Sequence, residues 1–334
     1  MRVCAISENT VEIRNVLLLQ QPSLIEEHAR ILESKANDLL PTVQILSASS
    51  PDDIPVTSAV DVVICPGLPW VKEVLESLAP LKWIHLLSAG ADYIFKWNLQ
   101  TASPILTSSK GIHAPAIAEF VVGAMLYFTK SFDEFRSNSE AHRWQRKWLG
   151  QLAGRRVFVL GLGHIGRAVA DACEFFGMRV HAAQRSESSR FPKPDTTGLL
   201  TDQVCLEVEE ADFLVVCLPL TNETLHLVDS SIFERLSRKP VLIDVSRGGV
   251  VSEAALVEAL DSGLLRGAAL DVFESEPLPA SSTLWSRPNV LLTPHVAGTF
   301  PDYFPRAIDV FLENASSLRQ GLGPVTAINL ERGY

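Results

Sequence analysis

The sequence predicts an α/β protein made of two doubly wound parallel-sheet domains with a cleft between them. Short β-branched runs alternate with longer amphipathic stretches twice along the chain, which is typical of parallel strands covered by helices. The length of 334 residues and the hydrophobic content of 47% are sufficient for two separate cores. Glycine and proline are scattered along the chain, so we expect order nearly throughout.

The first alternation runs from the amino terminus to Thr107. The runs with the length and composition of strands are Val3–Ile6, Val43–Leu46, Val60–Cys65, Trp83–Leu87 and Ile105–Thr107. An apolar run with helical spacing follows at Ala114–Lys130, and Pro115 suits its first turn. We expect this long helix to link the two domains.

The second alternation begins at Arg155 and is more regular. Its strand-like runs are Val157–Leu160, Arg179–Ala183, Phe213–Leu218, Val241–Val245, Ala268–Val272 and Val290–Thr293. Ser252 is a suitable N-cap for one of the helices between these strands, and Gly263 suits its carboxyl end. The residues after the last strand are too few for another domain, so we expect them to fold back onto the first one.

Composition and charge exclude several classes of function. The formal charge of −10 and the isoelectric point near 5.3 argue against a binder of nucleic acid or of anionic membranes, because both partners need a basic surface. The cysteines are dispersed in apolar runs without metal-ligand spacing, so we expect reduced thiols and no metal site; they are Cys4, Cys65, Cys173, Cys205 and Cys217. The first residues lack the apolar stretch of a signal peptide, and we expect a cytoplasmic protein.

A glycine-rich turn follows the first strand of the second alternation. Gly161 would permit a tight turn, Gly163 the close approach of a pyrophosphate, and Gly166 the close packing of helix on strand. The helix begins at about His164 and Ile165, where free N–H groups would meet the phosphates. A strand before this turn and a helix after it predict a dinucleotide site. We therefore assign dinucleotide binding to residues 104–293, and substrate binding to residues 1–103 with 294–334.

The next strand ends with Arg185 and Ser186, where a cofactor without a 2′-phosphate usually meets an acidic residue. A guanidinium suits a phosphate, and the serine hydroxyl adds a donor. These two residues favour NADP(H), with NAD(H) as the alternative. In that alternative, Arg185 is a solvated loop residue and Glu187 binds the ribose.

Three further runs come where later strands of this sheet should end, and ligands of doubly wound folds bind at that edge. They contain Arg247, Glu276 and His295, in that order. Each residue alone would be read as an ordinary loop residue. Together they place a forked cation, a carboxylate and an imidazole around one crevice.

With these runs the chain resembles the D-isomer-specific 2-hydroxyacid dehydrogenase family over nearly its whole length. The glycine turn, the three runs and Leu218–Thr224 carry the resemblance, and Glu276-Pro-Leu-Pro with Thr293-Pro-His295 is similar to NADPH-dependent glyoxylate/hydroxypyruvate reductases. The resemblance implies Rossmann-like or flavodoxin-like domains. It also implies further cofactor-binding residues, namely Leu218, Pro219, Thr224, Val245, Ser246, Asp271 and Gly298.

The resemblance implies the reduction of a small 2-keto acid to the D-2-hydroxy acid by hydride transfer. Arg247 would hold the substrate carboxylate, His295 would donate the proton, and Glu276 would orient the imidazole. Backbone N–H groups of the run Ser88, Ala89, Gly90 would also bind the substrate. Family dimers imply a homodimer with an arm at Phe132–Trp148.

Alternatives remain in the pocket lining and in the class of function. Phe300 would narrow the pocket, while Trp144, Trp148 and Trp285 suit a pocket, an interface, the core or the surface. One alternative is a reductase of larger branched or aromatic 2-keto acids, and another is a dinucleotide-sensing protein similar to the family's corepressors. Glu276 argues against the formate dehydrogenase branch, which carries glutamine there.

Overall fold

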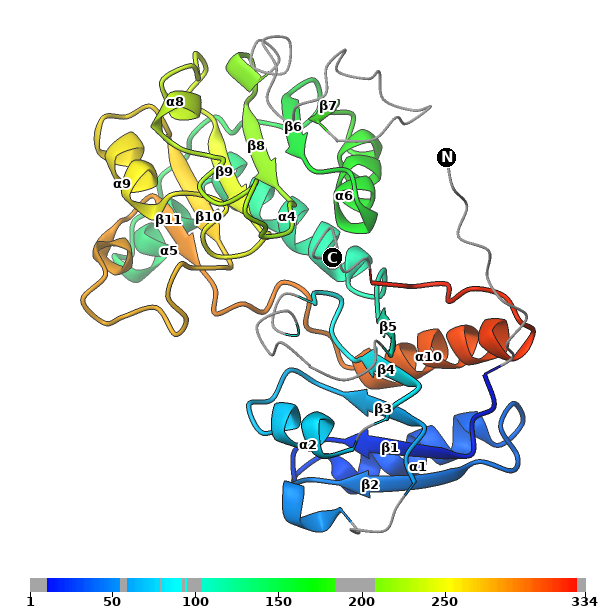
Figure 1. Cartoon of the computed structure of the whole chain (residues 1–334). Helices are drawn as coiled ribbons and strands as arrows, with labels where there is room; N and C mark the ends of the chain where they lie inside the picture. The colour runs from blue at the N-terminus through cyan, green and yellow to red at the C-terminus, as the bar shows by residue number, and fades with distance from the viewer. Residues whose placement is uncertain are drawn as a thin grey trace. The chain divides into compact units, whose positions relative to one another are not determined.

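A computed structural model of the chain describes residues 11–54, 59–78, 80–91, 94, 104–183 and 208–328. The chain divides into two compact units, one made of Met1–Ile112 with Phe300–Tyr334 and the other of His113–Thr299. Each unit is built on its own parallel sheet (Figure 1). The predicted fold class, two parallel-sheet α/β domains, is confirmed. Among the described residues no helix is both long and apolar enough to cross a membrane.

The sheet of the first unit has the strand order β2-β1-β3-β4-β5. Its strands, all parallel to their neighbours, are β1 Asn15–Leu19, β2 Gln44–Ala48, β3 Val62–Cys65, β4 Trp83–Leu86 and β5 Ile105–Ser108. The described helices of this unit are α1 Ile25–Ala36, α2 Val71–Ser77 and α10 Tyr303–Arg319, with a short 3-10 turn η1 at Pro51–Asp53. Helices α1 and α10 cover one face of the sheet, and α2 covers the other.

The sequence predicted β2 to β5 but missed β1. Asn15–Leu19 is a leucine-rich run without alternation, because Val16 and Leu18 face one core cluster while Leu17 and Leu19 face the other. A strand buried on both faces has no polar side to reveal its period. The run predicted at Val3–Ile6 lies outside the described residues.

The sheet of the second unit has the order β11-β10-β9-β8-β6-β7, and the described strands confirm all six predicted runs. They are β6 Arg156–Leu160, β7 Arg179–Ala183, β8 Phe213–Val216, β9 Val241–Asp244, β10 Gly267–Leu270 and β11 Val290–Leu292. The helices are α4 Ala114–Thr129, α5 Phe132–Glu140, α6 His164–Phe175, α8 Ser230–Phe233 and α9 Glu253–Asp261, with a 3-10 turn η2 at Thr283–Ser286. The topological switch, where ligands of such sheets bind, lies between β6 and β8.

Helices cover both faces of this second sheet. Val157 and Val159 of β6 pack with residues of α4 and α6, while Phe158 and Leu160 pack with residues of α8 and α9. Ser252 caps α9, because its hydroxyl accepts a hydrogen bond from the N–H of Ala255. Gly263 follows the helix with a φ of +70°, as its predicted role at the helix end requires.

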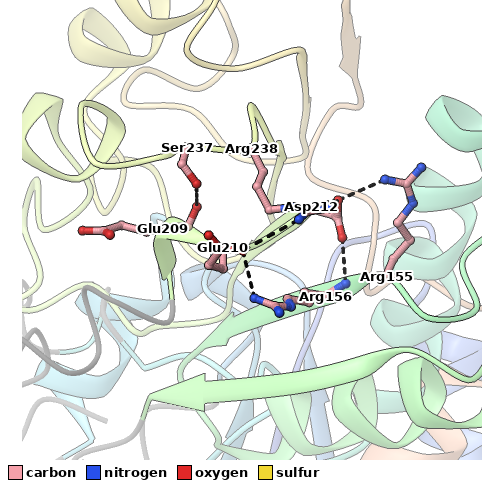
Figure 2. Close-up of polar contacts among 7 residues, drawn as sticks. All are labelled: Arg155, Arg156, Glu209, Glu210, Asp212, Ser237 and Arg238. Atoms are coloured by element: carbon pink, nitrogen blue, oxygen red, sulfur yellow. Dashed lines mark hydrogen bonds and ion pairs between the residues drawn. The ribbon is translucent and has the colours of Figure 1, made fainter.

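A charged cluster lies at the amino ends of β6, β8 and β9, at the edge of the sheet opposite the glycine turn. Asp212 is only 9% exposed, and its carboxylate accepts hydrogen bonds from Arg155 Nη1 at 3.0 Å, the Arg156 backbone N–H at 2.9 Å and Arg238 Nη2 at 3.2 Å (Figure 2). Burial alone would raise the pKa of Asp212, but these hydrogen bonds and positive charges outweigh it and lower the pKa. Asp212 therefore holds three segments of the chain together.

Asp212→Asn is expected to destabilise the protein by about 2 kcal/mol, because hydrogen bonds to a charged group are worth roughly 1.5–3 kcal/mol each and the neutral amide has an oxygen in place of only one of the two accepting carboxylate oxygens. Glu210→Gln is the matched control, since Glu210 bonds to Arg156 and Arg238 but is half-exposed. Its effect should stay below about 1 kcal/mol. Urea unfolding of both variants measures the difference. Equal losses would mean that Asp212 is no more than a surface ion-pair residue.

Candidate active site

The glycine turn joins β6 to α6 with little space around two of its glycines. Gly161 has a φ of +102°, and a Cβ there would lie 3.0 Å from the Cys217 carbonyl oxygen. A Cβ on Gly166 would lie 1.8 Å from the Gly161 carbonyl oxygen, so only glycine fits. A Cβ on Gly163 would meet nothing within 4 Å. The turn thus has the tight backbone and the open side that a pyrophosphate site needs.

The amino end of α6 suits an anion. Gly163 is its N-cap in extended conformation, and no side chain caps the helix. His164 and Ile165 open the first turn, so their N–H groups have no partner within the helix. The geometry fits a dinucleotide phosphate at this helix end.

The loop after β8 lies against the glycine turn. Leu218 is buried, and its Cδ2 would be 2.9 Å from a Cβ on Gly161. Thr224 is also buried; its hydroxyl donates to the Pro219 carbonyl at 2.7 Å and accepts from the Thr221 N–H at 2.8 Å. Thr224 therefore gives the loop its shape, which is a role that the sequence did not indicate.

Arg247 lies in the loop after β9. Its Nη1 donates to the Ser246 carbonyl at 2.8 Å, while the Ser246 hydroxyl donates to Asp244 Oδ1 at 2.5 Å. A Cβ on Gly248 would lie 1.7 Å from the Phe273 carbonyl oxygen. This backbone contact fixes the Arg247 loop against the loop after β10, which carries Glu276.

Asp244 is a buried carboxyl group at the end of β9. Its pKa is raised to about 7: burial is the largest cause, the charge of Asp271 acts in the same direction, and the hydrogen bonds from Ser246 act in the opposite direction. A buried acid that is difficult to ionise lowers the stability of the folded protein at every pH at which the unfolded chain has already lost the proton.

We expect the contribution of Asp244 to stability to fall as the pH rises from the ordinary pKa of 3.8 towards 7, because its carboxyl group in the folded state then holds a proton that the unfolded state has lost. Asp244→Asn resembles the neutral acid and keeps the oxygen that accepts from Ser246, so it should not show this decline. Urea midpoints at about pH 5 and about pH 8 should therefore differ between variant and wild type mainly at the higher pH. A difference of the same size at both would contradict the prediction.

Glu276 and His295 form a direct pair. His295 Nδ1 lies 2.8 Å from Glu276 Oε2, and Glu276 Oε1 accepts the Phe273 N–H at 3.0 Å. The carboxylate acceptor fixes the tautomer, with a proton on Nδ1 and Nε2 directed away from the pair. Both side chains are partly exposed, at 43% for His295 and 36% for Glu276. The imidazole is thus oriented and accessible, as proton transfer requires.

The loop that carries His295 is held by Asp271, which is buried at the end of β10. Its Oδ1 accepts from the Thr293 hydroxyl at 2.6 Å and the Val296 N–H at 2.8 Å, and its Oδ2 accepts from the Ala297 N–H at 2.9 Å. These bonds bracket His295, whose φ of 55° is left-handed. Asp271 therefore positions His295, and its predicted contact with the cofactor stays a prediction.

The predicted substrate loop follows β4 in the first unit. The Ser88 hydroxyl donates to the Gly90 carbonyl at 2.7 Å and closes the loop around Ala89. The Tyr303 hydroxyl donates to the Leu87 carbonyl just before the loop. Phe300 packs edge-on against Tyr303 with 6.1 Å between ring centroids. The loop is thus anchored to α10.

Several residues named from the sequence are either not described by the structure or exposed on the surface. Arg185, Ser186 and Glu187 are outside the described residues. Trp144 and Trp148 are 96% and 99% exposed, so a core role for them is wrong. Trp285 is 56% exposed, and its indole N–H donates to the Pro279 carbonyl at 3.0 Å.

Comparisons with known proteins identify the family of the chain. A family model described as "D-isomer specific 2-hydroxyacid dehydrogenase, NAD binding domain" matches residues 122–297, more than half of the 334 residues. The chain belongs to the D-isomer specific 2-hydroxyacid dehydrogenase family. It is therefore an NAD(P)-dependent oxidoreductase, and the predicted family and enzyme class are confirmed.

Three similar proteins have names that specify an activity or a ligand. A glyoxylate/hydroxypyruvate reductase of Arabidopsis thaliana is 30% identical over 319 residues, which cover 93% of this chain and 97% of the relative. The NADPH-dependent glyoxylate/hydroxypyruvate reductase of Sinorhizobium meliloti, solved with NADP and sulfate, is 25% identical with a TM-score of 0.82, covering 97% of this chain and 100% of that one. A family member of Xanthobacter autotrophicus, solved with NADPH and MES, is 28% identical with a TM-score of 0.81, covering 96% and 99%.

Proposed function

We propose that the protein is an NADPH-dependent reductase that converts a small 2-keto acid, of the glyoxylate or hydroxypyruvate type, to the D-2-hydroxy acid. The observation that carries the proposal is the His295–Glu276 pair at 2.8 Å, at the carboxyl edge of a dinucleotide-binding sheet. The similarity to two glyoxylate/hydroxypyruvate reductases supports the choice of substrate.

In this reaction His295 is the general acid. Its Nδ1–H is engaged by Glu276, so Nε2 carries the proton to the carbonyl oxygen of the substrate. The negative charge of Glu276 stabilises the imidazolium before the transfer. Arg247 binds the keto-acid carboxylate through its forked guanidinium and polarises the carbonyl group. NADPH, when bound, supplies the hydride.

The residues that would hold the cofactor come from the loops around the topological switch. The glycine turn with the amino end of α6 would bind the pyrophosphate, and Arg185 with Ser186 would bind the 2′-phosphate. The remaining contacts would come from Leu218, Pro219, Thr224, Val245, Ser246, Asp271 and Gly298. Backbone N–H groups of Ala89 and Gly90, held by Ser88, would complete the binding of the substrate carboxylate.

A spectrophotometric screen tests the proposal. Purified protein is mixed with NADPH or NADH and with glyoxylate, hydroxypyruvate, phenylpyruvate or a branched 2-keto acid. We expect the highest kcat/KM for glyoxylate or hydroxypyruvate with NADPH. Faster reduction of phenylpyruvate or the branched acid would favour the reductase of larger substrates. Tight dinucleotide binding without turnover of any keto acid would favour the dinucleotide-sensing protein.

We also propose a cytoplasmic enzyme, since Cys65 and Cys173 are buried free thiols whose pKa burial raises to about 12. Cys217 is a free thiol too, whereas Cys4 and Cys205 lie outside the described residues.

A homodimer is expected from the exposed aromatic residues of the segment Phe132–Trp148. Phe132, Trp144 and Trp148 are 54%, 96% and 99% exposed, and large apolar side chains gathered on one segment mark an interaction surface. Trp144→Glu combined with Trp148→Glu should give a monomer in sedimentation velocity, where the wild type sediments as a dimer. Phe175→Glu is the control, because Phe175 is an 88% exposed aromatic residue outside this segment. A monomeric wild type, or dissociation by Phe175→Glu alone, would refute the assignment.

A further inference from the structure

His113 lies next to the loop that carries His295, although nothing in the sequence marked it. It directly precedes α4, and its Nδ1 is 2.8 Å from the carbonyl oxygen of Gly298. A carbonyl oxygen only accepts, so His113 Nδ1 carries the hydrogen and donates it. A Cβ on Gly298 would lie 3.2 Å from this nitrogen and 3.5 Å from Cγ of the ring. The backbone at Gly298 therefore lies directly against the imidazole.

This contact completes the support of one loop. Asp271 binds Thr293, Val296 and Ala297 on both sides of His295, and His113 binds the next residue along, Gly298. The last residues of the loop are thus fixed by a buried carboxylate and by a histidine from the start of a helix. Since His295 has a left-handed backbone, it keeps its direction only if its neighbours are held.

The surroundings of His113 favour its neutral form. Burial is the larger cause that lowers the pKa of His113, and the positive charge of Arg247 lowers it further, while the bond to Gly298 acts in the opposite direction. A neutral ring with hydrogen on Nδ1 donates to Gly298 without adding a second positive charge beside Arg247.

We propose that His113 is a positioning residue of the reaction: its Nδ1–H···O bond to Gly298 fixes the end of the His295 loop beside Arg247. The inference rests on the proposed function, in which His295 transfers the proton. It adds the residue before α4 to the loops after β9, β10 and β11 that carry Arg247, Glu276 and His295. His113 does not touch the reacting atoms in this account and acts through the loop.

Two substitutions separate the hydrogen bond from the bulk of the side chain. In His113→Asn the amide Nδ2 takes the place of the imidazole Nδ1. Both nitrogens are the same number of bonds from Cα, so the donor to Gly298 is kept. His113→Leu has similar volume and no donor. Loss of the hydrogen bond to the carbonyl of the partly buried Gly298 should reduce kcat for glyoxylate by about tenfold in the leucine variant. The asparagine variant should stay within about threefold of the wild type.

A control variant accompanies the kinetic comparison, and an NMR measurement provides a second readout that does not depend on activity. His226→Leu removes a histidine that pairs with Glu274 on the surface, and it should leave kcat unchanged. In protein labelled at histidine, the NMR signal of His295 Cε1–H should move in His113→Leu and return in His113→Asn. If the leucine variant does not fold, His113→Ala is the donor-free variant.

The outcomes are distinguishable. An unchanged kcat and an unmoved His295 signal in the leucine variant would overturn the role of His113, and so would an asparagine variant as impaired as leucine. A wild type that reduces no keto acid would refute the proposed function, but the NMR comparison would still decide whether His113 positions His295.

Discussion

Replacing His295 with alanine is expected to lower the turnover of glyoxylate at least about a hundredfold, which is the usual scale of a general acid's contribution. The reason lies in the geometry around the imidazole. Its Nδ1 is engaged by Glu276 at 2.8 Å, the backbone is bracketed by Asp271, and 43% of the side chain stays exposed to receive a substrate. The variant should keep its fold, because His295 is not part of the core. Steady-state oxidation of NADPH measures the loss.

Glu276→Gln provides the matched comparison for His295→Ala. The amide oxygen can still accept from His295 Nδ1–H, but the negative charge that stabilises the imidazolium is gone and the Phe273 N–H loses its acceptor. We expect a smaller loss, about tenfold, in kcat with little change in the KM for NADPH. Near-normal turnover of a folded His295→Ala variant would remove His295 from the mechanism. Equal and small effects of both substitutions would point to another proton donor.

The parts of the site that the sequence predicted are those with local causes. Gly161 and Gly166 lie on one strand-turn-helix unit, where the turn gives Gly161 a φ of +102° and Gly166 packs against the Gly161 carbonyl. The order of Arg247, Glu276 and His295 after successive strands was also enough to predict that they follow neighbouring strands of one sheet. Parallel neighbouring strands bring their carboxyl ends together. Each of these inferences needs only a strand pattern and a residue type.

The parts that the sequence missed depend on contacts between distant segments. Asp271 follows an ordinary buried strand, and only the folded loop shows that its two oxygens bind Thr293, Val296 and Ala297. His113 lies 185 positions before Gly298, so no local pattern connects them. A buried carboxylate at the end of a central strand is the one signal that pointed towards Asp271, because such a group must find donors. No comparable signal exists for His113.

The cofactor preference should depend on Arg185. The glycine turn and the end of β7 are hydrogen-bonded, since the Gly161 N–H donates to the Ala183 carbonyl at 3.0 Å. The strand β7 ends at Ala183, beside this turn and two positions before Arg185 in the sequence.

Arg185→Ala is expected to raise the KM for NADPH by about ten- to a hundredfold, because a charge-assisted hydrogen bond is worth roughly 1.5–3 kcal/mol. The KM for NADH should change little, since NADH has no 2′-phosphate to lose. Arg185→Asp should go further, because a carboxylate repels the phosphate and accepts from the ribose hydroxyl of NADH.

Arg179→Ala is the control for charge: Arg179 is exposed at the opposite end of β7, so the net charge changes equally but far from the turn. Ser186→Ala should give a weaker effect of the same sign. If Arg185→Ala raises both Michaelis constants alike, or if the wild type uses NADH as efficiently as NADPH, Arg185 is a solvated loop residue and the preference for NADPH is wrong.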